Sequence, residues 1–349
     1  MENAFPLNFP TFPRKHFDEM CAAAKKHDPN NLPDPTTLRW RFDHAVGGRM
    51  DASESAYISR QLEWMRQGVL EVKYPALKGA IVVPIDTSVD PGAASYTYQV
   101  YDHVGSALVC ADLSTVPPRV DISGSESTQQ IRSVICAFGY SIQEARAAAF
   151  AKAPLIPRRA MAARDITERT LDDIWFNGHT VMGLKGLLNL AGTTTFTAGN
   201  AAAGGTLWDS KTPEEILFDL NGAVNLIVTN TKEIYAPDTV LLPLSLYTLI
   251  SSRRIGLGDS TTILAHFLKV SPYITNVFAT HKSETAGAGS TRRVVTYRRD
   301  PNVLTGILPQ PFEMLPPQSE NYEVVTPCHA RTGGVILFQP KAVCFTDGV

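Results

Sequence analysis

The spacing of hydrophobic and polar residues predicts several kinds of segment along this chain of 349 residues. The first 50 residues follow neither a helical nor a strand period, and they hold six prolines by position 35. Proline lacks an amide donor and drives its predecessor toward extended backbone, so an arm with little regular structure is expected here. A short helix is predicted from about Ser53, and short β-prone runs are predicted from Val72 to about Ile131.

The β-prone runs between residues 72 and 131 are AIVVPID, SYTYQVYDHV and SALVCADL, with a turn at DPGAAS. Side chains alternate along a strand, so the second run places Tyr96 and Tyr98 on one face and Tyr101 on the other. A two-stranded ribbon is only marginally stable alone in water. These aromatic rings therefore need a surface to cover, and the segment is expected to be an extended excursion with little core of its own.

A helical pattern covers residues 141–177 and is interrupted by Pro154 and Pro157. Proline breaks a helix interior but fits its first turn, so one helix is expected to end near Lys152 and a longer one to start near Pro157. Gly178 is expected to close the longer helix, because glycine tolerates positive φ. The positions predicted to share one face of this helix are Ala160, Ala163, Ile166, Thr170 and Ile174.

The longer helix leads into FNGHTVMGLKGLLN, which comes close to a phosphate-binding loop. That motif requires lysine and then serine or threonine directly after its second glycine. Here Leu184 separates Gly183 from Lys185, and a third glycine stands where the hydroxyl residue belongs. The stretch also follows a helix instead of opening one. We therefore interpret Gly178, Gly183 and Gly186 as a structural hinge that allows a tight return of the chain.

Residues 187–296 alternate between helix and strand and predict a compact α/β domain. TPEEILFDLNGAVNLIVTN begins with a capping box of Thr212 and Glu215, with Pro213 at the first helical position. Its apolar face comprises Ile216, Leu217, Leu220, Ala223, Val224, Ile227 and Val228. Strands are predicted at TVLLP, ITNVFATH and RRVVTYRR, and helices at LSLYTLISSR and at STTILAHFLKV from Ser260. The end of the chain is predicted to form strands separated by Pro and Gly turns.

Composition and charge narrow the class of protein. With 44% hydrophobic and 19% charged residues, the chain has the composition of a globular protein with a core. Its net charge of −2 argues against a dedicated nucleic-acid reader, which carries a strongly basic face. The five cysteines are widely spaced without a CxxC pair, and we interpret them as buried thiols from a reducing compartment. No apolar run approaches the length of a membrane span.

Motifs for catalysis and ligand binding are missing from the sequence. It has no GxSxG elbow, HExxH motif, zinc-type Cys/His spacing or EF-hand loop, so no enzyme activity, cofactor or metal is predicted. Cys328 and His329 are adjacent and suggest a thiol nucleophile. Neighbours on a strand point to opposite faces, however, which favours a structural cysteine.

Two sets of charged residues could belong either to a functional site or to an ordinary solvated surface. A run of carboxylates could form an acid–base or metal face, but the arginines among them favour a solvated or intersubunit helix face: Asp165, Glu168, Asp172 and Asp173. Four arginine pairs could touch phosphates weakly, but each is more typical of scattered surface charge: Arg158/Arg159, Arg253/Arg254, Arg292/Arg293 and Arg298/Arg299.

The order of parts, together with WFNGHTVMGLKGLLN, PDTVLLPLSLYTLI and YEVVTPCHARTGGVILFQPKAV, resembles the major capsid proteins of tailed bacteriophages with the Hong Kong 97 fold. The resemblance implies an α+β fold. Its parts would be an N-terminal arm with a short helix (1–71), an extended E-loop (72–131), P-domain helices including the spine helix (132–186), an A-domain (187–296) and strands that complete both domains (297–349). The chain departs from the family in its prolines ahead of the spine helix and in having no long leading segment like a fused scaffolding domain. The subunit is therefore expected to keep its N-terminus, with or without Met1, during maturation.

The resemblance also implies a function. The expected protein is a non-enzymatic shell subunit of the virion, assembled in the host cytoplasm as hexamers and pentamers of an icosahedral head around non-specifically contacted double-stranded DNA. Implied partners include scaffolding, portal and decoration proteins. The candidate intersubunit contacts are Tyr96, Tyr98, Tyr101, Arg158, Arg159, Asp172 and Asp173.

Two other classes of protein stay open as alternatives. An encapsulin-like shell around a cargo enzyme has the same fold but usually begins with a short amphipathic helix where this chain has a proline-rich arm. An α/β enzyme is the second alternative, and the missing catalytic motifs argue against it.

Overall fold

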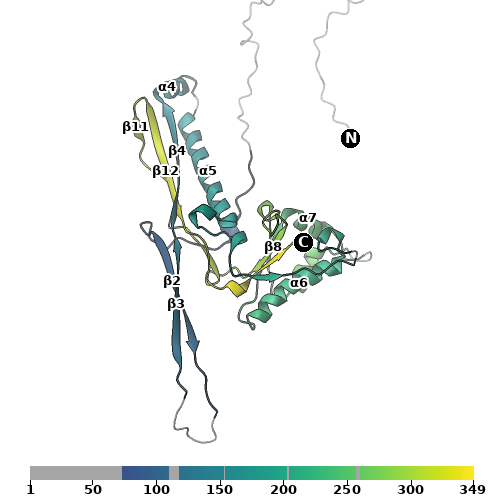
Figure 1. Ribbon diagram of the computed structural model, residues 1–349. Coiled ribbons are helices and arrows are strands. Elements are labelled where there is room, and N and C mark those ends of the chain that lie inside the picture. The colour runs from purple at the N-terminus through teal and green to yellow at the C-terminus, as the bar shows by residue number, and fades with distance from the viewer. Residues whose placement is uncertain (1–72, 110–117, 153, 203, 257–259) are drawn as a thin grey trace, which may run out of the picture. The chain divides into compact units, whose positions relative to one another are not determined.

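The computed structural model describes residues 73–109, 118–152, 154–202, 204–256 and 260–349 (Figure 1). The predicted arm and the helix expected from Ser53 lie outside these residues. The described chain begins with the short helix α3 (Gly79–Val82) and the two-residue strand β1 (Ile85–Asp86). The run AIVVPID is therefore divided between the end of α3 and the short strand β1, and it is not the single strand that its β-branched residues predicted. Val82, at the end of α3, and Val83, directly after it, are buried in the core.

Strands β2 (Ser95–Val104) and β3 (Asp121–Gln130) form an antiparallel ribbon in continuous register, and they are drawn side by side in Figure 1. The predicted turn before β2 is present, since the Asp90 carboxylate accepts a hydrogen bond from the amide of Gly92 at 2.6 Å. The partner strand is DISGSESTQQ and not SALVCADL, whose residues 106–109 form no strand. Because β3 is exposed on both faces, it lacks the apolar alternation that identifies a half-buried strand.

A four-stranded antiparallel sheet combines strands that are far apart in the sequence. Strand β12 (Glu323–Thr332) pairs with each of the other three strands. These are β4 (Arg132–Ser141), β10 (Gln310–Met314) and β11 (Gln318–Glu320). The sheet therefore joins one strand from the first half of the chain to three from its end.

Two helices follow β4. Helix α4 (Ile142–Phe150) begins with a capping box in which Ser141 and Glu144 exchange side-chain and backbone hydrogen bonds. Helix α5 (Leu155–Asn177) is the long helix. The predicted interruption between two helices is confirmed, but α5 starts before Pro157, which fits in its first turn.

The α/β domain is built on a five-stranded mixed sheet with the order β5-β14-β8-β6-β7. Strand β14 comes from the end of the described chain and lies between β5 and β8. The strands are β5 (Thr194–Phe196), β6 (Thr239–Pro243), β7 (Asn276–Thr280), β8 (Arg293–Tyr297) and β14 (Val343–Asp347). The three strands predicted from TVLLP, ITNVFATH and RRVVTYRR are thus present.

Three helices accompany this sheet: α6 (Pro213–Asn230), α7 (Leu244–Ser252) and α8 (Ile263–Val270). Helix α6 has the predicted capping box and Pro at its start. Helix α8 begins later than predicted, because the Thr262 side chain, and not Ser260, accepts the capping hydrogen bond from Ala265. Single 3-10 turns are η2 (Thr180–Met182), η3 (Leu187–Asn189), η4 (Trp208–Ser210), η5 (His281–Ser283) and η6 (Pro340–Ala342).

One core links the long helix to the α/β domain. It contains Trp175 and Phe176 of α5, Val295 of β8 and Val343 of β14 in a single buried cluster. A three-stranded sheet adjoins it, in which β9 (Leu304–Ile307) pairs with β1 in parallel and with β13 (Gly334–Leu337) antiparallel. A second cluster lies among α6, α7, α8 and the sheet. The predicted boundary between the helical region and the α/β domain lies between residues 186 and 187. Residues from both sides of this boundary share the first core, so the long helix and the domain are packed together.

Candidate assembly surface

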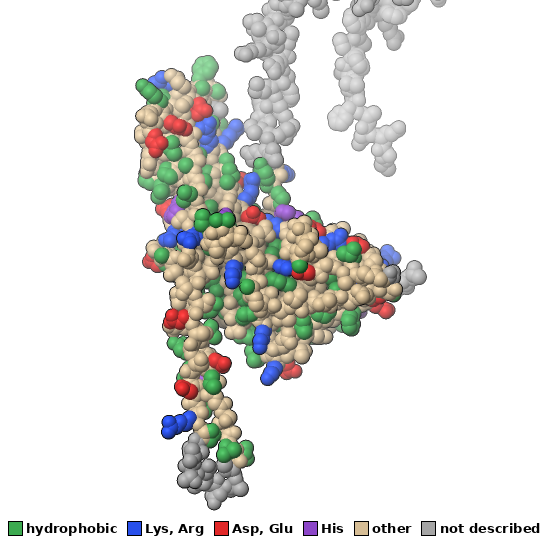
Figure 2. All heavy atoms as spheres, viewed as in Figure 1, with side chains coloured by type: hydrophobic (Ala, Val, Ile, Leu, Met, Phe, Trp, Pro, Cys, Tyr) green, Lys and Arg blue, Asp and Glu red, His purple; other side chains and the backbone are tan. Residues whose placement is uncertain are grey.

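The ribbon of β2 and β3 leaves large apolar side chains exposed. Tyr101, Val104 and Ile122 are 64%, 54% and 59% exposed. In Figure 2, hydrophobic side chains are interspersed with carboxylates along this part of the molecule. Nothing in the described part of the chain covers these three residues. Apolar side chains exposed together on an ordered element are typical of a contact surface.

Polar side chains hold the ribbon in its register. The hydroxyls of Thr97 and Thr128 lie 3.0 Å apart across the two strands. The Gln99 amide donates to the Glu126 carboxylate at 2.6 Å, and the Tyr101 hydroxyl donates to the Gln99 side-chain oxygen at 2.8 Å. The first two contacts join the strands, and cross-strand pairs of this kind stabilise a ribbon by a few tenths of a kcal/mol to about 1 kcal/mol each, whereas the Tyr101 contact lies within β2. These contacts and the continuous backbone ladder fix the register in which the ribbon presents its side chains.

The base of the ribbon packs against its own chain. The Tyr98 ring meets Phe338 edge-on with centroids 4.8 Å apart, and its hydroxyl donates to the Leu337 carbonyl at 3.4 Å. The guanidinium of Arg331, on β12, donates to the Ala93 carbonyl at 2.9 Å. Tyr98 thus has an intrachain partner that its predicted role as an intersubunit contact did not include.

The predicted alternation of the three tyrosines is confirmed. Tyr96 and Tyr98 are half-buried and line a cavity of about 660 Å³ at the ribbon base, together with Phe338 and Gln339. Tyr101 borders the cavity but keeps most of its surface exposed. Of the three, Tyr101 is the one whose ring is free for a partner.

The buried face of α5 agrees with the predicted one only in part, since Ala163 and Ile174 are buried as predicted. Ile166 is 56% exposed, whereas Thr167 and Leu171 are buried. Thr167 is polar but accepted in the interior, because its hydroxyl donates to the Ala163 carbonyl at 2.9 Å and lies 3.2 Å from Cys136 Sγ. The predicted face passed through Ile166 and Thr170, and nothing in the local spacing marked Thr167 as a buried position.

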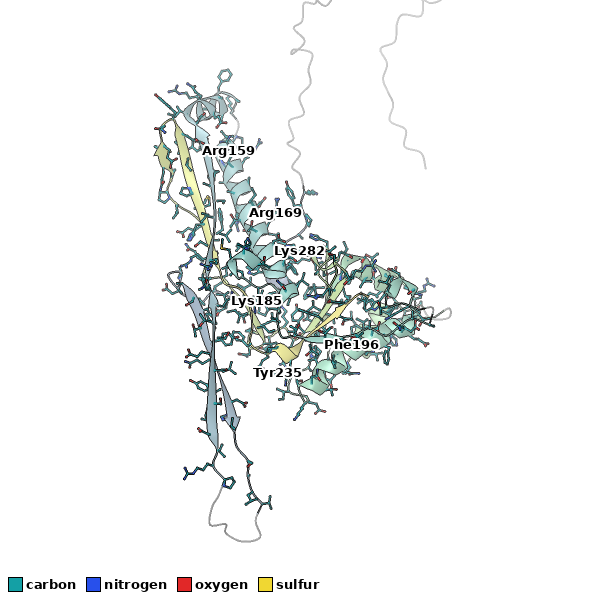
Figure 3. The ribbon with its side chains drawn as sticks, viewed as in Figure 1. Arg159, Arg169, Lys185, Phe196, Tyr235 and Lys282 are labelled. Atoms are coloured by element: carbon teal, nitrogen blue, oxygen red, sulfur yellow. The ribbon has the colours of Figure 1, made fainter. Side chains whose placement is uncertain are left out.

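A buried ion pair joins α5 to two other segments. One carboxylate oxygen of Asp172 accepts from the amide of Gly79 at 2.6 Å, at the start of α3. The other accepts from Lys282 Nζ at 2.6 Å. Lys282 follows β7 in η5, reaches Asp173 at 3.1 Å and lies 5.1 Å above the Phe176 ring (Figure 3). The three segments that meet here are the start of the described chain, the long helix and the α/β domain.

These contacts separate two residues that were predicted to act alike. Asp172 is buried and satisfied inside its own subunit, which departs from the predicted intersubunit contact. The helical spacing that placed it beside Asp173 could not show that Lys282 lies over it. Asp173 is 63% exposed at its side chain and keeps a free approach from solvent.

The predicted arginines also differ. Arg159 lies in the first turns of α5 (Figure 3), pairs with Glu144 at 3.2 Å and donates to the Gly139 carbonyl. The hydrogen bond from Arg159, followed by that from the Ser141 amide, lowers the pKa of Glu144 below its ordinary value. Arg159 therefore ties α5 to α4 and β4 within the chain, while Arg158 is exposed.

Two of the three glycines after α5, Gly178 and Gly186, form a close-packed joint. Gly178 has φ 71° and ψ −171°, a conformation that essentially only glycine adopts. Gly186 has ordinary angles, but a Cβ there would lie 2.4 Å from the Gly178 nitrogen. Gly183 also has positive φ and faces open space. Backbone packing explains the motif that resembled a phosphate-binding loop.

The sequence patterns missed two further ion pairs in the α/β domain, one buried and one half-buried. Asp219 lies on the apolar face of α6 and binds the ammonium of buried Lys211 and, at 3.0 Å, the indole nitrogen of Trp208. Arg293 and Asp347 form two parallel hydrogen bonds of 2.7 Å between β8 and β14. The sequence signal that could have indicated the first pair is the charged residue Asp219 at a position where the helical pattern expects an apolar one.

Among the described residues, no three His, Cys, Asp or Glu side chains are grouped so that they could hold a metal ion. No helix in that part of the chain combines the length and apolar content needed to span a membrane. The candidate assembly surface consists of the exposed ribbon residues, supported by contacts of the ribbon base with its own chain.

Comparison with protein families identifies the family to which the chain belongs. A family described as major capsid protein matches residues 105–349, which include the ribbon strand β3, the long helix and the whole α/β domain. The chain belongs to the major capsid protein family. A search of curated protein sequences finds no match.

Solved structures show the same fold at low sequence identity. The capsid of Myoviridae phage XM1 matches with a TM-score of 0.74 and 15% identity, covering 85% of this chain and 100% of that chain. The protein of Mycobacterium phage Adephagia matches with a TM-score of 0.58 and 12% identity over 83% and 98% of the two chains. The capsid of the native GTA particle matches with a TM-score of 0.59 and 10% identity over 86% and 99%.

The fold expected from the sequence resemblance, the Hong Kong 97 type, is confirmed by these matches. The capsid protein is a component of the virion shell, as the family description and the phage capsids with this fold together indicate. We keep the names that the sequence resemblance suggested as labels: E-loop for the ribbon, spine helix for α5, and A-domain for the five-stranded sheet with its helices. The division of the chain into these domains stays a prediction.

Proposed function

We propose that copies of this capsid protein assemble as hexamers and pentamers of an icosahedral head that encloses double-stranded DNA, without any enzymatic role. The observation that carries this proposal is the ordered ribbon with Tyr101, Val104 and Ile122 exposed. Burying a side chain of this size contributes roughly 1.5–3 kcal/mol relative to leaving it exposed. In the proposed shell, the adjacent subunit would cover these side chains on every subunit.

The proposed contents and location follow from the same subunit role. The net charge of −2 supports non-specific contact with the enclosed DNA, since sequence-specific readers carry a strongly basic face. We propose assembly in the host cytoplasm with scaffolding, portal and decoration proteins as partners. Of the predicted contacts, Tyr101, Asp173 and Arg158 are the ones that the described structure leaves exposed to a neighbour.

Electron microscopy in negative stain tests assembly. The purified protein, expressed with phage head proteins, is expected to form shells or free rings of five and six subunits. A monodisperse monomer across a range of salt concentrations would contradict the proposal. The contents are tested separately on particles from infected cells. DNA without a stoichiometric enzyme supports the head, whereas a co-purifying enzyme without nucleic acid supports a cargo compartment instead.

A pair of substitutions tests the ribbon contact. Tyr101→Asp places a charge on a surface that we expect to be desolvated, at a cost above about 1.4 kcal/mol per contact, so particle yield is expected to fall at least about tenfold. The melting temperature of the isolated subunit should not change, because Tyr101 is mostly exposed there. Tyr101→Phe is the matched control and should assemble. Unchanged yield for Tyr101→Asp in a sedimentation assay would show that the ribbon makes no such contact.

Tyr98→Asp should behave differently. It removes the ring contact with Phe338 and is expected to destabilise the isolated subunit by about 1 kcal/mol in addition to any effect on assembly. Thermal melting followed by circular dichroism distinguishes the two variants. An equal melting temperature for both would contradict the assignment of Tyr98 to the interior of its own subunit.

A further inference from the structure

Two thiols face each other across the P-domain sheet. In the antiparallel pairing of β4 with β12, Cys136 is the Cα partner of Cys328. Directly opposed residues of an antiparallel pair have Cα atoms roughly 4.5–5.5 Å apart and side chains on the same face. A disulfide needs a Cα separation of about 4.4–6.8 Å. The strand register therefore holds the two cysteines within disulfide distance.

The surroundings of the two sulfur atoms differ. Both lie on the side of the sheet that faces the spine helix, where Cys136 Sγ is 3.2 Å from Thr167 Oγ1. Cys328 is buried, whereas Cys136 is half-buried. Burial, and then the charge of the nearby Cys136, raises the pKa of Cys328 to about 11. A small oxidant dissolved in water therefore reaches Cys136 more easily, and Cys328 is placed to react second.

We propose that Cys136 and Cys328 form a reversible intrachain disulfide when the subunit meets a disulfide oxidant such as oxidised glutathione. The Cys136 thiolate attacks one sulfur of the oxidant, which forms a mixed disulfide and releases one glutathione thiolate. Cys328 then loses its proton and attacks Sγ of Cys136, releasing the second glutathione thiolate. Two protein thiols are oxidised, one glutathione disulfide is reduced, and the two released protons end on the two glutathione thiols.

The bond would connect distant parts of the chain. It would tie β4, which precedes the α/β domain, to β12, which follows all but the last strand of that domain. Cross-links over long loops restrict the unfolded chain most. A reducing compartment would keep the pair as thiols during assembly, and release into an oxidising medium would close it. Cys344 provides a comparison, because its strand partners are Thr194 and Thr296 and not another cysteine.

The test uses the full-length reduced protein. It is treated with oxidised glutathione under native conditions, its remaining thiols are alkylated, and its peptides are mapped by mass spectrometry. We expect a peptide pair joined through Cys136 and Cys328, lighter by two hydrogen atoms than the free peptides. We also expect a melting temperature about 5 °C higher, reversed by a dithiol reductant.

The matched variants sharpen this result. Cys344→Ser should retain the linked peptide and the shift, whereas Cys136→Ser should lose both. Recovery of Cys136 only as a glutathione adduct, of both thiols in alkylated form, or of Cys328 linked to a different cysteine would overturn the proposal. If Cys136→Ser does not fold, the peptide map of the unsubstituted protein still decides between these outcomes.

Discussion

Replacing Lys282 with methionine tests whether the ion pair at the end of the spine helix holds three segments together. The substitution keeps a long apolar side chain but removes the ammonium that lies 2.6 Å from Asp172 and 3.1 Å from Asp173. Asp172 is left with one hydrogen bond, from the amide of Gly79. Its carboxylate has a side-chain exposure of 6%, so solvent cannot replace the lost partner.

The expected loss follows from this burial. Removing one partner of a buried ion pair costs about 3–5 kcal/mol, and the residual exposure of Lys282 places this case near 3 kcal/mol. Asp173 adds little because it is exposed. The control is Arg164→Met, which breaks the exposed pair of Arg164 with Glu168 on the same helix and should have a much smaller effect.

Urea unfolding of the isolated subunit, followed by circular dichroism, gives the free energy by linear extrapolation. The double variant Asp172→Asn with Lys282→Met should lose no more than Lys282→Met alone, since the amide of asparagine carries no charge to leave unpaired. A loss below about 1 kcal/mol for Lys282→Met, or one equal to that of the control, would refute the reasoning. Strictly additive effects in the double variant would do the same.

Two further outcomes are expected. Gly186→Ala should lower the free energy of unfolding by more than about 2 kcal/mol, because its Cβ would lie 2.4 Å from the Gly178 nitrogen. Gly183→Ala should lower it by about 1 kcal/mol, because Gly183 has positive φ but faces open space. Equal melting temperatures for the two variants would be inconsistent with this. Burial raises the pKa of Asp347, but hydrogen bonds, chiefly from Arg293, lower it by more, so its folded pKa is below 3.8. The stability from Asp347 is then present above pH 3.8 and lost as the pH falls through the folded pKa, and Asp347→Asn should reduce the acid sensitivity of unfolding below about pH 4; an unchanged slope between this variant and the parent would contradict it.

Local signals in the sequence were sufficient for much of the fold. The capping box of Thr212 and Glu215 fixed the start of α6, because both partners lie within one helical turn. The glycine stretch was interpreted as structural because neither its spacing nor its position after a helix suits phosphate binding, and the close approach of Gly178 and Gly186 supports that interpretation. The alternation of Tyr98 and Tyr101 followed from strand geometry alone.

Contacts between distant residues were the part that the sequence could not supply. Strand β3 is polar throughout, so only its pairing with β2 identifies it. Lys282 carries no local sign that it lies over Asp172, far away along the chain, and this contact turned a predicted surface residue into an interior one. The pairing of Cys136 with Cys328 likewise depends on the register of two strands from opposite ends of the described fold.

Strand β14 lies between β5 and β8, although it is made after both. While the polypeptide is being synthesised, β5 and β8 leave the ribosome with their facing edges unpaired, and the A-domain sheet closes only when residues 343–347 follow. A nascent chain therefore lacks a finished sheet in this domain until residues 343–347 have been translated. In the proposed shell, the position of this one strand delays assembly, because two chains on the same messenger RNA cannot join through this domain before residues 343–347 of each have left the ribosome.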